Sequence, residues 1–421
     1  MKIKEIRARQ LIDCKCRPMV EADVVLEDGT VGRGAAPTGS SVGMYESCVL
    51  RDGDPKEYGG LSVHRAVANV NDVIGPRLAG MDIYDQGAVD QAMIDLDGTP
   101  DKHVLGGNAI YSVSVAAYRA AAASKGQTLY DYIAGGDLRT VPIPSFNVIN
   151  GGMNAGVRQA FNEFIVMPYG AADIEEAVET AVQVFQILGD VIRDHTGREP
   201  LVGGSYGWCA PSEDPEVCLD LIQEAIRRAG REGTCGLCLD CASSEMYEKD
   251  KGYYMNGRYL SSAELVAYAK GLTEKYDFVF IEDLMDENDW EGWSLAHQEL
   301  TRTLLIGDDF TVSNPARIQR AYKANAIDGF ILKPNQVGTI TEALRAQVFA
   351  SGHGLLSITS GRSGGVVGDV VMDLAVGLRI PFIKNGCPRS GERIDKLNFL
   401  MRAKDLHPGC HMARIDDLIR F

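Results

Sequence analysis

The chain has 421 residues, more than a single hydrophobic core normally organises, so at least two domains are expected. Hydrophobic residues make up 45% and charged residues 24%, an ordinary composition for a globular protein. The formal net charge of −16 argues against nucleic-acid binding through a basic surface, and a small anionic substrate would need a locally positive pocket.

The N-terminal stretch MKIKEIRARQLIDCKCRP lacks the apolar region of a secretory signal. No segment reaches the roughly eighteen apolar residues that a membrane-spanning helix needs. Ten cysteines without a signal peptide are expected to be reduced thiols. The sequence therefore predicts a cytoplasmic protein without membrane or nucleic-acid partners.

The residue pattern of the first part of the chain predicts an α+β domain over residues 1–135. Apolar residues alternate with polar or small ones across residues 20–26, and the following Asp28-Gly29 pair predicts a hairpin turn. Residues 62–133 then show a helical, alanine-rich pattern. A Gly-Gly pair and the stretch VPIPS mark the end of this domain.

In residues 140–421, short apolar strands alternate with amphipathic helices such as DIEEAVETAVQVFQILGDVIRDH and PARIQRAYKAN. Repeated βα units indicate a parallel sheet, and about 280 residues suit a (β/α)8 barrel. The predicted fold class is therefore α/β, with a TIM-like catalytic barrel and an N-terminal α+β capping domain.

Five of the predicted strands end in charged residues, namely Asp240, Glu282, Asp308, Lys333 and Lys384. An isolated charge at such a place is usually a solvated loop residue. In a barrel, however, the C-terminal strand ends converge on the face where active sites are built. The repeated pattern therefore predicts one catalytic site at that face.

The carboxylates of Asp240, Glu282 and Asp308 offer an all-oxygen site, which favours Mg²⁺. Lys333 and Lys384 are expected on the far side of the same mouth. A divalent ion opposite a lysine suits abstraction of a proton next to a carboxylate, because the ion stabilises the enolate-like dianion while the amine accepts the proton. Lys333 is thus predicted to be a general base, with a pKa depressed by the metal and the second lysine.

The spacing of Cys235, Cys238 and Cys241 also admits an iron–sulfur cluster. The segment predicts a strand, however, and residues three apart on a strand point to opposite faces. Buried structural thiols are the preferred interpretation.

Over nearly its whole length the chain resembles the enolase (phosphopyruvate hydratase) family. Seven segments carry the resemblance in the expected order: LEDGTVGRGAAPTGSSVGMYESCVLRDGD, NVINGGMNAG, NEFIVMP, FIEDLMDENDW, LIGDDFTVSNP, LKPNQVGTITE and GERIDKLN. The resemblance implies a carbon–oxygen lyase (hydro-lyase) of glycolysis that acts on 2-phosphoglycerate or phosphoenolpyruvate. It also implies a homodimer or an assembly of dimers.

The resemblance assigns metal and carboxylate ligands. Asp240, Glu282 and Asp308 would bind a first Mg²⁺, and Lys384 would hold the substrate carboxylate with that metal. Ser41, in TGSSVG, would ligate a second Mg²⁺ when a mobile loop closes.

It also assigns roles around the reacting atoms. Lys333 would be the base, Glu163 would belong to the acid side, and Arg362 with Ser363 would grip the phosphate.

Three positions depart from the family pattern on the leaving-group side. Where enolases carry GDEGGFAP this chain reads GGSYGWCAP, so the acid glutamate is replaced by Ser205 or Tyr206, depending on a one-residue gap. Asn154 stands in place of one active-site histidine and remains a candidate substrate ligand, and Gly361 replaces a second histidine. A general acid contributes about a hundred- to ten-thousand-fold in rate, so its loss should cripple dehydration.

Three functions remain open on this reasoning. The first is authentic 2-phosphoglycerate dehydration, with Glu163, Tyr206 or a water in place of the glutamate. The second is a divergent paralogue acting on a related phospho- or phosphono-carboxylate, as enolase-like proteins do in phosphonate biosynthesis. The third is a non-catalytic metabolite-binding protein, against which the retained Lys333 argues.

Overall fold

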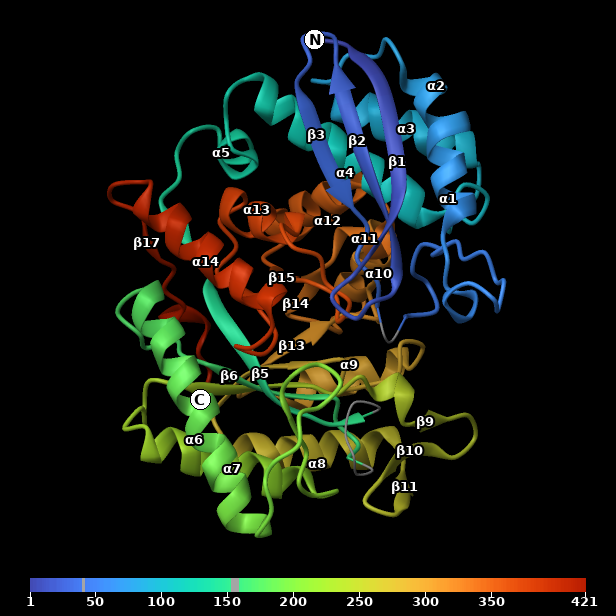
Figure 1. Cartoon of the computed structure of the whole chain (residues 1–421). Helices are drawn as coiled ribbons and strands as arrows, with labels where there is room; N and C mark the ends of the chain where they lie inside the picture. Colours follow the sequence, from blue (N-terminus) through green and yellow to red (C-terminus); the bar gives the residue numbers. More distant parts are fainter. Residues whose placement is uncertain (40–41, 153–158) are drawn as a thin grey trace.

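The computed structural model describes residues 1–39, 42–152 and 159–421 (Figure 1). The N-terminal part is a three-stranded antiparallel sheet in the order β1-β2-β3, with helices beside it. Its strands are β1 (Ile3–Ile12), β2 (Pro18–Leu26) and β3 (Val31–Ala35), and its helices are α1 (His64–Ala68), α2 (Gly75–Leu78), α3 (Gln86–Asp97), α4 (Gly107–Ser124) and α5 (Leu129–Ala134).

The predicted hairpin is present between β2 and β3. The backbone N–H of Thr30 donates to the Asp28 side chain at 2.9 Å, and Gly29 adopts a φ of 87°, which residues with a side chain rarely adopt. The strands paired by this turn bury one face against α4.

Close approach between β3 and α4 requires glycine at two positions. A Cβ atom on Gly32 would lie 2.1 Å from the carbonyl oxygen of Ala116, and one on Gly34 would lie 2.2 Å from that of Ser112. Backbone atoms cannot yield as a flexible side chain can, so these contacts fix how closely sheet and helix pack.

We expect Gly34→Ala to lower the stability of the protein by about 1–3 kcal/mol, because the added methyl group overpacks a backbone contact. The matched control is Gly271→Ala, since a Cβ there meets no atom within 4 Å and the residue lies inside a helix, where alanine is favoured over glycine. Thermal unfolding should show a lower midpoint for the first variant and an unchanged or higher midpoint for the second. Equal midpoints would contradict the packing argument.

The rest of the chain forms a barrel. Among the described residues, eight strands close into a ring in the order β5-β6-β8-β12-β13-β14-β15-β16, because β16 pairs back with β5. The strands are β5 (Ile143–Asn150), β6 (Glu163–Met167), β8 (Gly236–Asp240), β12 (Phe278–Glu282), β13 (Leu304–Gly307), β14 (Gly329–Leu332), β15 (Leu356–Ser360) and β16 (Phe382–Lys384).

Helices surround this ring, and Figure 1 shows the N-terminal domain, in blue, at one end of it. They are α6 (Ile174–Thr196), α7 (Pro215–Arg228), α8 (Ser262–Lys275), α9 (Trp290–Glu299), α10 (Pro315–Lys323), α11 (Pro334–Val337), α12 (Ile340–Gly352), α13 (Val370–Gly377) and α14 (Gly391–Asp405). In the described part of the chain, no helix combines the length and apolar character needed to cross a bilayer.

The barrel prediction is confirmed, but the expectation of a wholly parallel sheet is wrong at β6. This strand runs antiparallel to both neighbours, β5 and β8. An antiparallel pair such as β5 and β6 needs no crossover, whereas a parallel pair does, usually through a helix. As a result β6 begins, rather than ends, at the mouth where its parallel neighbours end.

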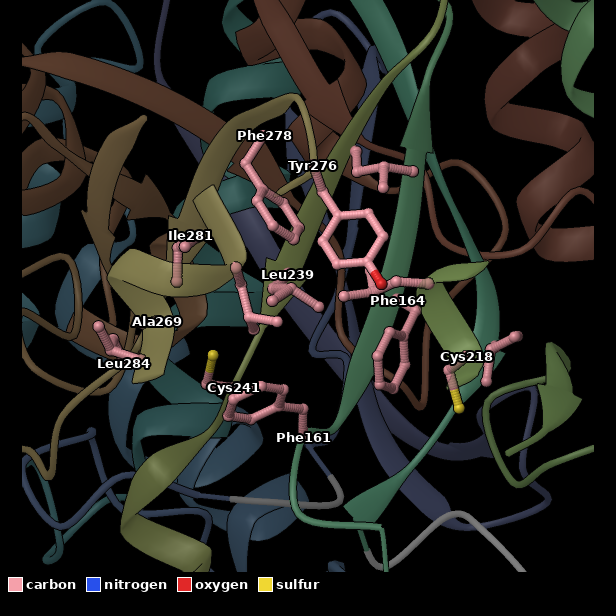
Figure 2. Close-up of a cluster of buried hydrophobic side chains, with 14 of the residues drawn as sticks. Phe161, Phe164, Cys218, Leu239, Cys241, Ala269, Tyr276, Phe278, Ile281 and Leu284 are labelled. Atoms are coloured by element: carbon pink, nitrogen blue, oxygen red, sulfur yellow. The ribbon is translucent and has the colours of Figure 1, made fainter. Parts of the chain in front are cut away.

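Alternate residues of the barrel strands enter two different cores. Phe280 and Phe382 come from opposite strands and stack inside the ring, with centroids 6.0 Å apart, and Cys238 belongs to the same cluster. Leu239 and Cys241 instead join the cluster beneath the surrounding helices, drawn in Figure 2.

The cysteines of the C-x2-C-x2-C run therefore separate as the strand pattern predicts. Cys238 and Cys241 lie in different clusters, and burial raises the pKa values of both thiols. Burial also raises the pKa of Cys235 to about 11. Protonated thiols on opposite faces are poor ligands for a cluster.

Candidate active site

The charged strand ends converge on one cavity of about 90 Å³ at the C-terminal mouth of the barrel. Glu282 pairs in register with Asp240, and Asp308 and Lys333 follow directly after β13 and β14. Four of the five predicted charges line this cavity, and the fifth, the fully buried Glu282, contacts one of them, Lys384.

We expected the two lysines to lie across the mouth from the carboxylates. Instead, both lysines contact them directly. Lys384 Nζ lies 3.0 Å from Asp240 Oδ2 and 2.5 Å from Glu282 Oε2. Lys333 Nζ donates to Asp308 Oδ2, whose other oxygen accepts a 2.8 Å hydrogen bond from Gln336 Nε2. Both ammonium groups thus form buried ion pairs.

These contacts affect the pKa of Lys333. Burial is the largest single effect and lowers the pKa of this amine, but Asp308 and further carboxylates such as Glu282 together raise it by more, so the net shift is upward from 10.5. The pKa of Lys384 is likewise raised, because Asp240 and Glu282 outweigh the effect of burial. The sequence reasoning considered a bound metal ion and the second lysine but not a carboxylate in direct contact, and the depressed pKa expected with a metal ion bound stays a prediction.

Two overlapping carboxylate groups could bind a cation. The closest cluster is Asp283, Asp308 and Asp309, whose ligand atoms lie within 4.8 Å of one another. The two oxygens of Asp283, however, accept the backbone N–H groups of Asp308 and Asp309 at 2.8 and 2.7 Å, so this side chain positions the loop.

The predicted set of Asp240, Glu282 and Asp308 fits a hard cation better. Burial and the neighbouring Asp240 raise the pKa of Glu282. Its Oε1 atom is buried without a hydrogen-bond partner among the described residues. A buried carboxylate oxygen of this kind, beside two further carboxylates, is the donor set that Mg²⁺ takes.

Glu163 reaches the mouth because β6 runs antiparallel. As the first residue of this strand, it pairs in register with both Asn150 and Asp240. Its Oε1 atom accepts a 2.7 Å hydrogen bond from Asn147 Nδ2, and its Oε2 atom lies 3.6 Å from Lys384 Nζ.

The predicted phosphate ligands belong to the same cavity. Arg362 and Ser363 both line it, two and three residues after the end of β15. The buried Arg362 guanidinium donates to Glu46 Oε2 at 2.6 Å and to Glu46 Oε1 at 3.1 Å. Glu46, from the N-terminal domain, was missed by the sequence reasoning, although it lies in one of the segments that carry the resemblance.

Ser205 and Tyr206 are placed differently. Ser205 is buried and lines the cavity, whereas Tyr206 is not among the described lining residues. The Tyr206 hydroxyl donates to the carbonyl oxygen of Cys14 at 2.9 Å. Of these two candidates, Ser205 is therefore the one in reach of a bound molecule. Ser41 and Asn154 lie outside the described residues.

Two further cavity residues, Arg393 and Lys396 on α14, were not identified from the sequence. The segment GERIDKLN contains both, but nothing in its pattern says that this helix turns them toward the barrel mouth. Arg393 donates from Nη1 to the carbonyl oxygen of Ser205 at 2.6 Å.

Three residues around the site have strained backbone conformations. Asp283, Val312 and Ser313 adopt φ values of 46°, 45° and 53°, a region that non-glycine residues rarely occupy. The Ser313 hydroxyl accepts the backbone N–H of Lys333 at 2.8 Å, so one strained residue helps to place the lysine.

Family models match both parts of the chain. One described as the enolase N-terminal domain matches residues 3–133, and one described as the enolase C-terminal TIM barrel domain matches residues 138–409. The chain therefore belongs to the enolase family.

Proposed function

We propose that this protein is an Mg²⁺-dependent lyase that removes the proton α to the carboxylate of a small phospho-carboxylate such as 2-phosphoglycerate. The observation that supports it most is the place of Lys333: a buried amine at a strand end, in the same cavity as Lys384 and Asp240. Membership of the enolase family supports lyase-type chemistry.

Asp240, Glu282 and Asp308 would hold the metal ion. Bound there, Mg²⁺ would neutralise the carboxylates and stabilise negative charge developing on the substrate. Lys384, already among the same carboxylates, is in reach of a substrate carboxylate at that place.

Lys333 must lose its proton before it can act as a base. In the structure, the contact with Asp308 favours the protonated amine. The productive arrangement therefore requires this contact to weaken when substrate is bound, so that Nζ can approach the α-carbon proton.

Arg362 and Ser363 would bind the phosphate. The Arg362 guanidinium uses Nη1 and Nη2 on Glu46, so a phosphate there would share or replace that carboxylate.

The residues on the leaving-group side favour proton abstraction over loss of the leaving group. Ser205 is a weaker acid than a carboxylic acid, and Gly361 offers no side chain at all. Proton abstraction should therefore outpace loss of a poor hydroxide leaving group, which supports a divergent member of the family over authentic 2-phosphoglycerate dehydration.

The test uses 2-phosphoglycerate and Mg²⁺ in deuterium oxide. Deuterium at the α-carbon is followed by NMR, and phosphoenolpyruvate by its ultraviolet absorbance. We expect exchange to be clearly faster than phosphoenolpyruvate formation. Equal rates would indicate authentic dehydration with a replaced acid, and neither reaction at any Mg²⁺ concentration would contradict the proposal.

A further inference from the structure

We propose that Arg393 and Lys396 form a second anion-binding subsite beside Ser205, which takes an acidic group carried in addition to the carboxylate and phosphate of the substrate. This inference rests on the proposed function and specifies its substrate class. It identifies the extra group as an oxyanion, such as a carboxylate or a phosphonate.

The first observation is that a lysine fills the space opened by Gly361. A Cβ atom built on Gly361 would lie 2.7 Å from Lys396 Nζ, so no larger residue fits there without displacing the ammonium group. Lys396 itself is 3% exposed and lines the cavity. Glycine at position 361 therefore gives this ammonium group its place at the cavity wall.

The second observation is that Arg393 occupies the Ser205 end of the cavity. Its Nη1 atom donates to the Ser205 carbonyl oxygen, and its guanidinium lies 4.9 Å from the centre of the Tyr206 ring. Both contacts hold the side chain in one orientation, which lowers the entropic cost of binding an anion.

The third observation concerns which charges face the cavity. Arg393 and Lys396 line it, whereas their shared carboxylate partner, Glu392, is not among the described lining residues. Arg362 and Glu46 repeat this arrangement on the wall assigned to the phosphate. In both places buried cations line the cavity, and the carboxylate that they contact is not among the described lining residues.

A Cβ atom at Gly365 would lie 2.1 Å from Glu392 Oε1, so this position too must lack a side chain for the balancing carboxylate to fit. Two buried carboxylates, Glu392 and Asp369, lie beside these cations, but neither is among the described lining residues, so an incoming anion meets the cationic groups first.

The test compares two ligands by calorimetry in Mg²⁺. Phosphoenolpyruvate carries a carboxylate and a phosphate, and 2-phosphonooxybutenedioate, used as both geometric isomers, adds a carboxylate at the neighbouring carbon. We expect one isomer to bind the native protein about tenfold or more tightly than phosphoenolpyruvate, as a charge-assisted contact implies.

The main variant is Lys396→Met combined with Glu392→Gln, because removing the lysine alone would leave a buried carboxylate unpaired. We expect it to bring the ratio of the two affinities close to one. The matched control is Lys404→Met on the same helix, since Lys404 pairs with Glu175 at the surface, and it should keep the native ratio.

The outcomes separate the two proposals. If the native protein does not bind phosphoenolpyruvate with Mg²⁺, the proposed function fails and this inference fails with it. If phosphoenolpyruvate binds but neither isomer is preferred, or if the double variant keeps the preference, only the subsite is overturned.

Discussion

Replacing Lys333 by alanine is expected to lower α-proton exchange by about a hundred- to ten-thousand-fold, the usual contribution of a positioned general base. No other amine in the described cavity stands at the same strand end, and Lys384 is engaged by Asp240 and Glu282. The measurement is deuterium incorporation into 2-phosphoglycerate at saturating Mg²⁺, followed by NMR.

The alanine variant also removes an ion pair, so folding must be checked alongside exchange. Asp308 keeps its hydrogen bond from Gln336, and circular dichroism would show whether the barrel remains intact. Lys270→Ala is the control, because Lys270 pairs with Glu299 on the outer surface. Exchange at the native rate in a folded Lys333→Ala protein would contradict the role of this residue as the base.

The strand ends were predictable because a parallel barrel gathers the ends of its strands at one mouth, whatever the details of its loops. Asp240, Glu282 and Lys384 each occupy the last position of a strand, as their apolar runs indicate. Local pattern and global topology agree at these positions, and the prediction needed nothing more.

The direction of β6 could not be predicted in the same way. A short apolar run such as EFIVM reads alike in both directions, and its orientation depends on which neighbours it pairs with. Glu163 therefore reaches the mouth from the first residue of a strand, a place that a strictly parallel barrel would put at the opposite end.

The contacts among charged groups were also beyond the sequence. The upward shift of the Lys333 pKa depends on Asp308, 25 residues away in the chain, and on burial of both groups. The position of Lys396 depends on a helix docking against the glycine at position 361. Such contacts exist only after the barrel has closed, because no local pattern specifies them.

Lys384→Met should destabilise the protein by about 3–5 kcal/mol, since it leaves the Asp240 and Glu282 carboxylates buried without their ammonium partner. The loss should grow with pH. Burial and Asp240 already raise the pKa of Glu282, and a group with a raised folded-state pKa loses its contribution to stability as pH rises through that value. Urea unfolding between about pH 5 and pH 8 measures the trend.

Magnesium adds a readout that does not depend on activity. If Asp240 and Glu282 hold the cation, Mg²⁺ replaces the missing ammonium charge in the variant, whereas in the native protein it competes with Lys384 for the same oxygens. The thermal midpoint of Lys384→Met should therefore rise more with Mg²⁺ than that of the native protein. Lys275→Met, whose lysine pairs at the surface with Glu216, should behave as the native protein does. An equal response in all three proteins would contradict a cation site at these carboxylates and would favour the neighbouring cluster of Asp283, Asp308 and Asp309 instead.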